Sequence, residues 1–298
     1  MKKSNSISRQ IRNHMHKPIL HKKLPFGILW TAKSGCTFLW AWFFFQLNRT
    51  QYKRIPIHQI RRCHYDTKAF QNAVATDKKW YKVVRNPFDR ATSSYIHACR
   101  HKYDDAGISK FLGEPPENID KKGFTFRQYI TYLRDCKDTN IHGHPQNSPL
   151  DLILQPTIID LRQMNDFLRK LEQQYNLKPA NFDELHKITK STTIRVNFNF
   201  FTGDTKFRTN SPSLPSVRSS PVDRKEHFPL TTEFYDDSIE AMVLSLFEQD
   251  FQRYQYKPTL CEINHPTPYG KMPSTGEKIN FPNLPNLKNL PANSLPQT

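Results

Sequence analysis

The sequence predicts a single α/β domain in which helices flank a parallel β-sheet. The apolar run 26–31 has no polar alternation, as is typical of a strand buried on both faces of such a sheet. A second strand is predicted at 79–84, and each strand is followed by residues with helical spacing. This order of strand, helix, strand, helix indicates βαβ units, whose ligand sites lie at the carboxyl ends of the strands.

Composition and charge limit the class of partner. The chain has 298 residues, 37% hydrophobic and 12% aromatic, which is enough for one sizeable core. Its formal net charge of +17 favours a polyanionic partner: nucleic acid, acidic lipid headgroups, a phosphorylated nucleotide, or a sulfated or carboxylated glycan. Charge alone does not choose among these.

The termini and the cysteines bear on location. Residues 1–22 are predicted to be a flexible basic arm, 23–257 the folded domain and 258–298 a proline-rich, poorly ordered tail. The first 23 residues lack the apolar stretch of a secretory signal, and the longest apolar run, 38–45, is far shorter than the ~20 residues that span a bilayer. We expect a cytoplasmic protein, soluble or peripherally membrane-associated.

Five cysteines, an odd number, are widely separated and lack C-x-x-C spacing. They indicate a reducing compartment and no structural metal. The cysteines are Cys36, Cys63, Cys99, Cys136 and Cys261.

In the first half of the domain, the strand at 26–31 is followed by a helix predicted over 37–47, packed on most of its circumference. Residues 49–77 are mixed and basic, and no element is assigned to them. The strand at 79–84 ends before Asn86 and Pro87 because proline cannot donate to the ladder. A helix follows over 88–101, with Asn86 as a possible cap and Pro87 in its first turn.

In the second half, an amphipathic helix is predicted over 124–136, and 140–147 is a loop. Residues 151–160 have strand character, and a helix follows over 161–175. A long amphipathic helix is predicted over 236–254. The Pro/Ser-rich stretch 211–221 is expected to be a loop.

Between the first strand and its helix lies the polar turn "KSGCT", residues 33–37. At the start of a helix, backbone N–H groups and the helix dipole form a binding site for an anion. Gly35 has no side chain, so a ligand can come close to the backbone there. Lys33 adds a mobile charge and Thr37 a hydroxyl. The turn is not a Walker A loop, because its lysine precedes the glycine, and this argues against a kinase or ATPase.

A second motif, "RNPFDRATSSY", covers 85–95, again where a strand ends and a helix begins. Arg85 can bind a phosphate bidentately, and Ser93 lies about two helical turns further on. The alternative is that Arg85 and Arg90 are solvated and that Asp89 and Arg90 form a surface pair.

Together, "AKSGCT" and "VRNPFDRATSSY" resemble the 5′-phosphosulfate loop and the 3′-phosphate motif of sulfotransferases that use 3′-phosphoadenosine 5′-phosphosulfate (PAPS). The form R-x-P-F-[DE]-R-x-x-S-x-Y is most similar to the carbohydrate branch, of the Golgi chondroitin 4-O type, and its bacterial relatives. "NIHGHPQ" resembles that branch's H-W-x-P-Q loop, with Gly143 in place of tryptophan. The closing helix resembles D-F-x-x-F-G-Y, with Gln255 in place of glycine.

The resemblance implies a P-loop-like sulfotransferase fold, PAPS as co-substrate and no metal. It also implies roles for particular residues. Lys33 would contact the bridging oxygen and the sulfonate, and Arg85 with Ser93, eight residues later, would hold the 3′-phosphate. The 5′-phosphate loop would comprise Ser34, Gly35, Cys36, Thr37 and Phe38.

A hydroxyl acceptor must also lose a proton to a nearby base. His64, His142 and His144 are the candidates, with Asp66 behind them. His64 lies 21 residues before Arg85, where some sulfotransferases place their base, and His142 matches the histidine of the H-W-x-P-Q loop. His97 and His101 are expected on the solvated face of their helix.

The leading hypothesis is therefore sulfonate transfer to a hydroxyl of a glycan, a glycolipid or a similar polar acceptor, with possible peripheral membrane contact. One alternative is a non-catalytic basic protein of the same fold that binds phosphate or nucleic acid. Nucleic acid is not expected, because no helix-turn-helix, zinc-finger or RNP signature is present.

Overall fold

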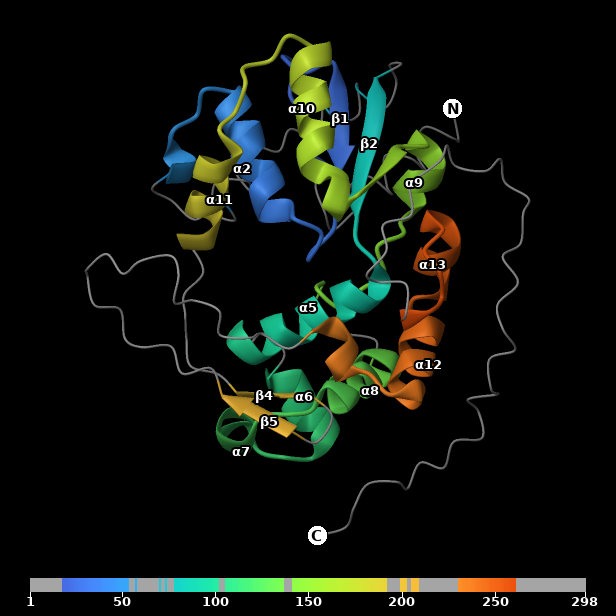
Figure 1. Cartoon of the computed structure of the whole chain (residues 1–298). Helices are drawn as coiled ribbons and strands as arrows, with labels where there is room; N and C mark the ends of the chain where they lie inside the picture. Colours follow the sequence, from blue (N-terminus) through green and yellow to red (C-terminus); the bar gives the residue numbers. More distant parts are fainter. Residues whose placement is uncertain are drawn as a thin grey trace.

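The structure is a computed structural model (Figure 1). It describes residues 18–53, 57, 70, 73, 78–101, 105–136, 141–191, 199–202, 205–208 and 230–260. Most of the predicted arm, the loop at 211–221 and the tail from 261 onward lie outside the described residues, as does most of 54–77.

A parallel sheet of three strands forms the centre of the upper body in Figure 1. Its strands are β1 (Phe26–Leu29), β2 (Lys79–Val84) and β3 (Thr157–Asp160), in the order β1-β2-β3. Every residue of β1 is buried, as is every residue of β2 after Lys79. The predicted α/β architecture is confirmed, and the observed bounds of β2 are those predicted.

Helices α2 (Cys36–Gln46), α10 (Met164–Gln174) and α11 (Phe182–Ser191) share one apolar cluster with β1 and β2. Trp42 of α2 donates to the buried Glu172 carboxylate of α10 at 2.8 Å, so the two helices are also joined by a hydrogen bond. The prediction that the first helix is packed on most of its circumference is confirmed by its buried side chains: Cys36, Phe38, Leu39, Trp40, Ala41, Trp42, Phe43 and Phe44.

The lower body in Figure 1 is built around α5 (Pro87–His101), which begins three residues after β2 ends. Tyr95 and Phe126 lie in its core cluster, which continues up to Val84. The other elements of this body are α6 (Asp105–Leu112), α7 (Pro116–Lys122), α8 (Phe126–Asp135), α12 (Asp237–Leu246) and the hairpin of β4 (Asn199–Thr202) and β5 (Thr205–Arg208).

The segment 151–160 differs from its prediction. Its first part belongs to helix α9 (Pro149–Leu154), and only its last four residues form β3. Ser148 and Asp151 form a capping box with Pro149 in the first turn, and these local signals start a helix despite the apolar run that follows. The prediction for 161–175 is right in type, with a 3₁₀ turn at Leu161–Gln163 before α10.

The closing helix predicted over 236–254 is broken in two. Helix α12 ends at Leu246, and α13 runs over Glu248–Tyr254. Phe247 between them has φ −114° and ψ 23°, and its buried side chain anchors the bend in the lower core. The bend directs Asp250 of α13 toward the loop at 146–147, where its carboxylate accepts backbone hydrogen bonds.

Within the described ranges, the structure contains no helix with the length and apolar character needed to cross a bilayer.

Candidate active site

The turn at 31–35 leads from β1 into α2 with two residues in left-handed backbone conformations. Lys33 has φ 69° and Gly35 has φ 75°. A lysine pays an energetic penalty of about 1–2 kcal/mol in this conformation, and such strain is concentrated at functional sites. The turn therefore holds the Lys33 backbone in a conformation that its side chain does not favour.

The amino end of α2 is open to an anion. Gly35 is its N-cap and offers no side-chain cap, the first turn carries no acidic residue, and the first amide to donate back is that of Leu39, to the Gly35 carbonyl at 3.1 Å. The N–H groups before Leu39 and the helix dipole thus favour a negative charge at this end.

Gly35 is required for packing as well as for its backbone conformation. A Cβ atom there would lie 2.6 Å from Leu161 Cδ1 and 3.2 Å from Met164 Cε. The absence of a side chain at Gly35 thus makes room for α10 and the turn before it. This packing role adds to the one predicted from the sequence, in which glycine lets a ligand approach the backbone.

Arg85 extends from the end of β2 toward this turn. Its Nη1 donates to the Lys33 carbonyl at 3.3 Å, so the two motifs are in direct contact. Burial lowers the pKa of the Arg85 guanidinium, opposed chiefly by the charge of Asp89. Among the described residues, no carboxylate lies within ion-pair distance of Arg85, and this partly buried cation is suited to an external anion.

Ser93 lies on α5, the helix that starts directly after Arg85 and Asn86. It is half-buried, between the buried Thr92 and Ser94. The Asn86 side chain accepts from the backbone N–H of Phe88 at 2.9 Å, which confirms the expected cap at the start of this helix.

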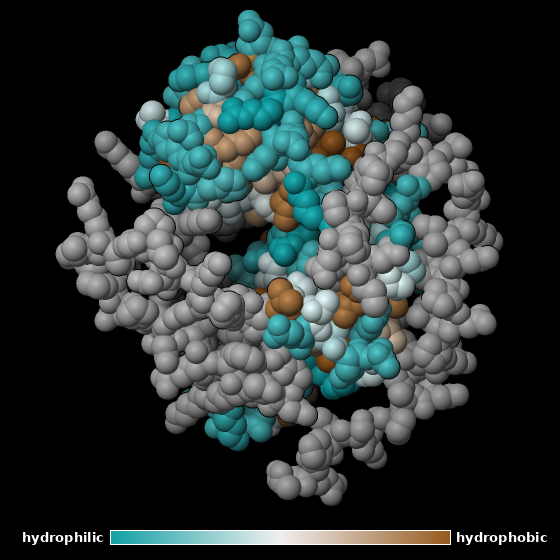
Figure 2. Space-filling view, in the orientation of Figure 1, coloured by the Kyte–Doolittle hydropathy of each residue, from teal (hydrophilic) through white to brown (hydrophobic). Residues whose placement is uncertain are grey.

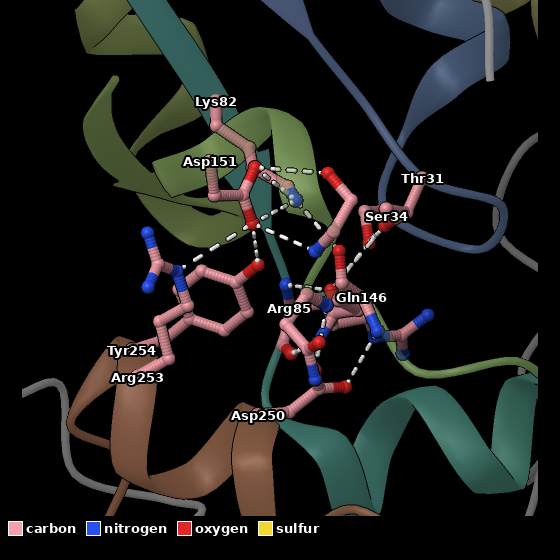
Figure 3. Close-up of polar contacts among 11 residues, drawn as sticks. Thr31, Ser34, Lys82, Arg85, Gln146, Asp151, Asp250, Arg253 and Tyr254 are labelled. Atoms are coloured by element: carbon pink, nitrogen blue, oxygen red, sulfur yellow. Dashed lines mark hydrogen bonds and ion pairs between the residues drawn. The ribbon is translucent and has the colours of Figure 1, made fainter. Parts of the chain in front are cut away.

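Gln146, which the sequence analysis did not single out as a site residue, joins the two motifs (Figure 3). Its Oε1 accepts from the Ser34 hydroxyl at 2.9 Å and from the Arg85 backbone N–H at 2.9 Å, and its Nε2 donates to the Arg85 carbonyl at 2.7 Å. The Ser34 hydroxyl, which also contacts Thr31, is thereby engaged inside the protein. The signal was present in the H-x-x-P-Q pattern, of which Gln146 is the last residue.

Arg90 is the second missed residue, and the surface-pair alternative for it is wrong. Only 1% of Arg90 is exposed, and its guanidinium donates to the carbonyls of Ala32, His142 and His144. Burial lowers the pKa of this guanidinium, and the carboxylate of Asp250 opposes the effect most. Arg90 therefore fixes the first turn against the histidine loop.

The candidate bases are distributed unevenly. His142 lies in the loop held by Arg90, and its ring packs against that of His97 with 4.2 Å between centroids. His97 is half-buried, so its expected place on a solvated helix face is wrong. His144 occupies the same loop, whereas His64 and Asp66 lie outside the described residues.

A buried polar network supports the site from behind. Lys82 of β2 donates to both carboxylate oxygens of Asp151, at 2.7 and 2.8 Å, and Tyr254 donates to Asp151 at 2.7 Å (Figure 3). Burial lowers the pKa of Lys82, and its interaction with Asp151 opposes this effect.

Figure 2 shows a hollow between the upper and lower bodies, the region into which the strand ends lead.

Comparison with protein families decides the classification. The model of the sulfotransferase family matches residues 26–257, which include both motifs, the 141–147 loop and α13. The chain belongs to the sulfotransferase family. As a sulfotransferase it is a PAPS-dependent transferase, and the α/β sheet with its flanking helices agrees with that fold. Comparisons with curated proteins and with solved structures give no match.

The hydrogen-bond donors at the start of α2 and on Arg85 fit a co-substrate that carries phosphates at two positions. The amino end of α2 lacks a side-chain cap, and Arg85, in contact with the same turn, lacks a carboxylate partner among the described residues. In the described ranges no cluster of three or more His, Cys, Asp or Glu side chains could hold a metal ion. The described cysteines Cys36 and Cys136 are free thiols.

Proposed function

We propose that this sulfotransferase moves the sulfonate of PAPS to a hydroxyl of a carbohydrate or a similar polar acceptor. One observation carries the proposal: the Arg85 guanidinium donates to the carbonyl of Lys33. The two motifs are thus adjacent. They must be adjacent if one small nucleotide is to bind to both of them through its two phosphate positions.

When bound, PAPS supplies an activated sulfonate that is displaced in line from the 5′-phosphate. Lys33 stabilises the negative charge that builds on the leaving phosphate oxygen, and the amino end of α2 provides preorganised N–H donors. In this assignment Ser34, Gly35, Cys36, Thr37 and Phe38 form the loop around the 5′-phosphate. Arg85 and Ser93 hold the 3′-phosphate, which distinguishes PAPS from simpler adenine nucleotides.

The acceptor hydroxyl gives its proton to a base as its oxygen bonds to the sulfur. We assign this role to His142, the first residue of the H-x-x-P-Q pattern, in a loop that Arg90 brings to the Lys33 turn through hydrogen bonds to the carbonyls of Ala32, His142 and His144. His64 remains a second candidate. The imidazole must be neutral to accept the proton.

The acceptor class rests on two supports. The motif at 85–95 resembles that of the carbohydrate branch, and the net charge of +17 favours an acidic glycan or glycolipid over a neutral or cationic acceptor. Peripheral contact with a membrane that carries such a glycolipid is part of the proposal.

The test is transfer of label from ³⁵S-PAPS to a panel of glycans, glycolipids and small alcohols. We expect a labelled glycan or glycolipid with the wild type and a rate about 10²–10³ lower in Lys33→Ala, the size of effect seen on removal of one donor that stabilises transition-state charge. Arg85→Ala should lose preferential binding of adenosine 3′,5′-bisphosphate (PAP) over adenosine 5′-phosphate.

Lys23→Ala serves as the matched control, because Lys23 is an exposed lysine ten residues before Lys33. Wild-type turnover in Lys33→Ala would refute the role of Lys33. Label found only on small alcohols would refute the proposed acceptor class.

A further inference from the structure

We infer that Gln146 is a positioning residue that sets the distance between the 5′- and 3′-phosphate loops. The inference rests on the proposed function and adds a determinant of co-substrate specificity that does not itself contact the nucleotide. Its basis is a single side-chain amide that bonds both loops at once.

The amide can satisfy its neighbours in one orientation only. The Arg85 backbone presents both an N–H donor and a C=O acceptor to it, and they pair with Oε1 and Nε2 at 2.9 and 2.7 Å. This two-point contact fixes the plane of the amide. Oε1 then accepts from the hydroxyls of Ser34, at 2.9 Å, and Thr31, at 3.4 Å, on the other loop.

Gln146 acts through these loops and not on the ligand, because none of its surface is exposed. Ser34, its partner in the first loop, is equally buried and lies between Lys33 and Gly35, the two residues with left-handed backbone. A shift of the amide would therefore move the turn that presents Lys33 relative to the strand end that presents Arg85.

The backbone of Gln146 is itself held by buried charges. Its carbonyl accepts from Lys82 Nζ at 2.6 Å, and its N–H donates to Asp250 Oδ2 at 2.7 Å. Lys82 is fixed by Asp151, and Asp250 also accepts from the N–H of Asn147. Charge-assisted hydrogen bonds of this kind are stronger than neutral ones, so the backbone of Gln146 is held rigidly in place.

A fixed distance between two anion sites has a measurable effect on binding. A ligand with both phosphates gains affinity over either monophosphate only if the two sites match its geometry, as in any two-point attachment. Loss of the amide should leave each site able to bind its own phosphate, but should reduce the extra affinity for the bisphosphate.

The experiment compares Gln146→Met with wild type by calorimetric titration of PAP, adenosine 5′-phosphate and adenosine 3′-phosphate. Methionine keeps most of the volume and removes both amide functions. We expect the ratio of monophosphate to PAP dissociation constants to fall about tenfold or more in Gln146→Met, because the two loops are then no longer held at the spacing of the bisphosphate. Gln173→Met, on the exposed side of α10, should keep the wild-type ratio.

The outcomes separate this inference from the proposed function. A wild type that does not prefer PAP to adenosine 5′-phosphate refutes the proposed function. If the wild type prefers PAP and Gln146→Met has the same ratio of monophosphate to PAP dissociation constants, the positioning role is refuted, even if the variant has a lower melting temperature. Should Gln146→Met not fold, Ser34→Ala removes one contact to Oε1 and must lower the ratio in the same direction, or the inference fails.

Discussion

Two arginines five positions apart in one motif have different environments. Among the described residues, the Arg85 side chain, at the end of β2, donates to one carbonyl, whereas that of Arg90, on α5, donates to three. The carbonyls around Arg90 satisfy a buried cation without neutralising it, so its role is to hold loops together. Arg85 makes fewer contacts within the described part of the chain, which supports the proposed assignment of this arginine to the 3′-phosphate.

The base assignment predicts different results for two neighbouring histidines. His142→Ala should lower the rate of sulfonate transfer about 10²–10⁴-fold, the usual contribution of a general base. His144→Ala is the matched control, because both residues give their backbone carbonyls to Arg90 and neither substitution removes a carbonyl.

Steady-state assays with a fixed acceptor measure the effect, and binding of PAP should stay within about twofold of wild type in both variants. If His144→Ala has the larger loss, the base is His144. Near wild-type rates in both variants would instead leave His64 as the candidate.

The ion pair behind the site predicts a stability effect. Lys82→Met removes the cation from a fully buried carboxylate, Asp151, and should lower the free energy of unfolding by about 3–5 kcal/mol. Lys79→Met, three residues earlier on β2 and exposed, removes a cation–π contact with Tyr81 and should lower it by at most about 1 kcal/mol. Urea denaturation followed by circular dichroism compares the two, and equal effects would contradict a buried, paired Lys82.

Elements with strong local signals were predictable. The run at β2 is bounded by the polar Asp77 and Lys78 before it and by Asn86 and Pro87 after it, and its predicted limits are those observed. Residues 151–160 were misassigned because a short apolar run is compatible with either a strand or a buried helix. The capping residue Ser148 lies three residues before this segment.

The bend at Phe247 was not predictable from periodicity. Apolar residues continue through it at helical spacing, and only burial of Phe247 in the lower core requires the change of direction. At the far end of α13, Gln255 has φ 56°, the left-handed conformation. The sulfotransferases that the sequence resembles have glycine at this place, the residue that adopts such a backbone without cost.

Helix α12 gives a prediction on its cap. Asp236 accepts from the N–H groups of Ser238 and Ile239, both at 3.0 Å, and pairs with Arg127. Asp236→Ala should lower the free energy of unfolding by about 1 kcal/mol, the usual value of an N-cap. Asp237→Ala, in the first turn of the same helix, is the control and should have a smaller effect.

The effect of Asp236 should depend on pH. Burial tends to raise the pKa of Asp236, but the backbone N–H of Ile239 and the guanidinium of Arg127 outweigh it and lower the pKa below its ordinary value of 3.8. The stabilisation is therefore complete above pH 3.8 and is lost as the pH falls through the lowered value. Chemical denaturation of wild type and Asp236→Ala at pH 7 and near pH 2 should show the difference shrinking, and a constant difference would contradict this cause.

At the scale of the whole molecule, contacts between residues far apart in the sequence could not be predicted. Both motifs could be recognised in the sequence because each is local to one strand and one helix, and their phosphate-binding roles stay predictions. The role of Gln146 could not be predicted, because its side chain bonds residues 61 to 115 positions away, and the H-x-x-P-Q pattern does not specify which strand ends it joins. The same holds for Arg90, whose three carbonyl partners come from two distant loops.

The net charge of +17 predicts salt-dependent binding. The association rate constant for PAP should fall about tenfold or more between about 0.05 and 0.5 M NaCl, because salt screens the attraction between the basic protein and an anionic nucleotide. Stopped-flow fluorescence measures this rate. Adenosine, which is neutral, is the control ligand, and a PAP rate constant insensitive to salt would contradict electrostatic steering.

The break at Phe247 also bears on synthesis of the protein. The loop at 146–147 depends on Asp250, and the pair of Lys82 with Asp151 is completed by Tyr254. A ribosome-bound chain that has already emerged through residue 230 contains both motifs and Gln146, yet it lacks Asp250 and Tyr254, which hold the backbone of Gln146 and complete the pair of Lys82 with Asp151. We expect the nascent enzyme to acquire nucleotide binding only after α13 has left the ribosome, so the site is completed at the end of translation of the domain.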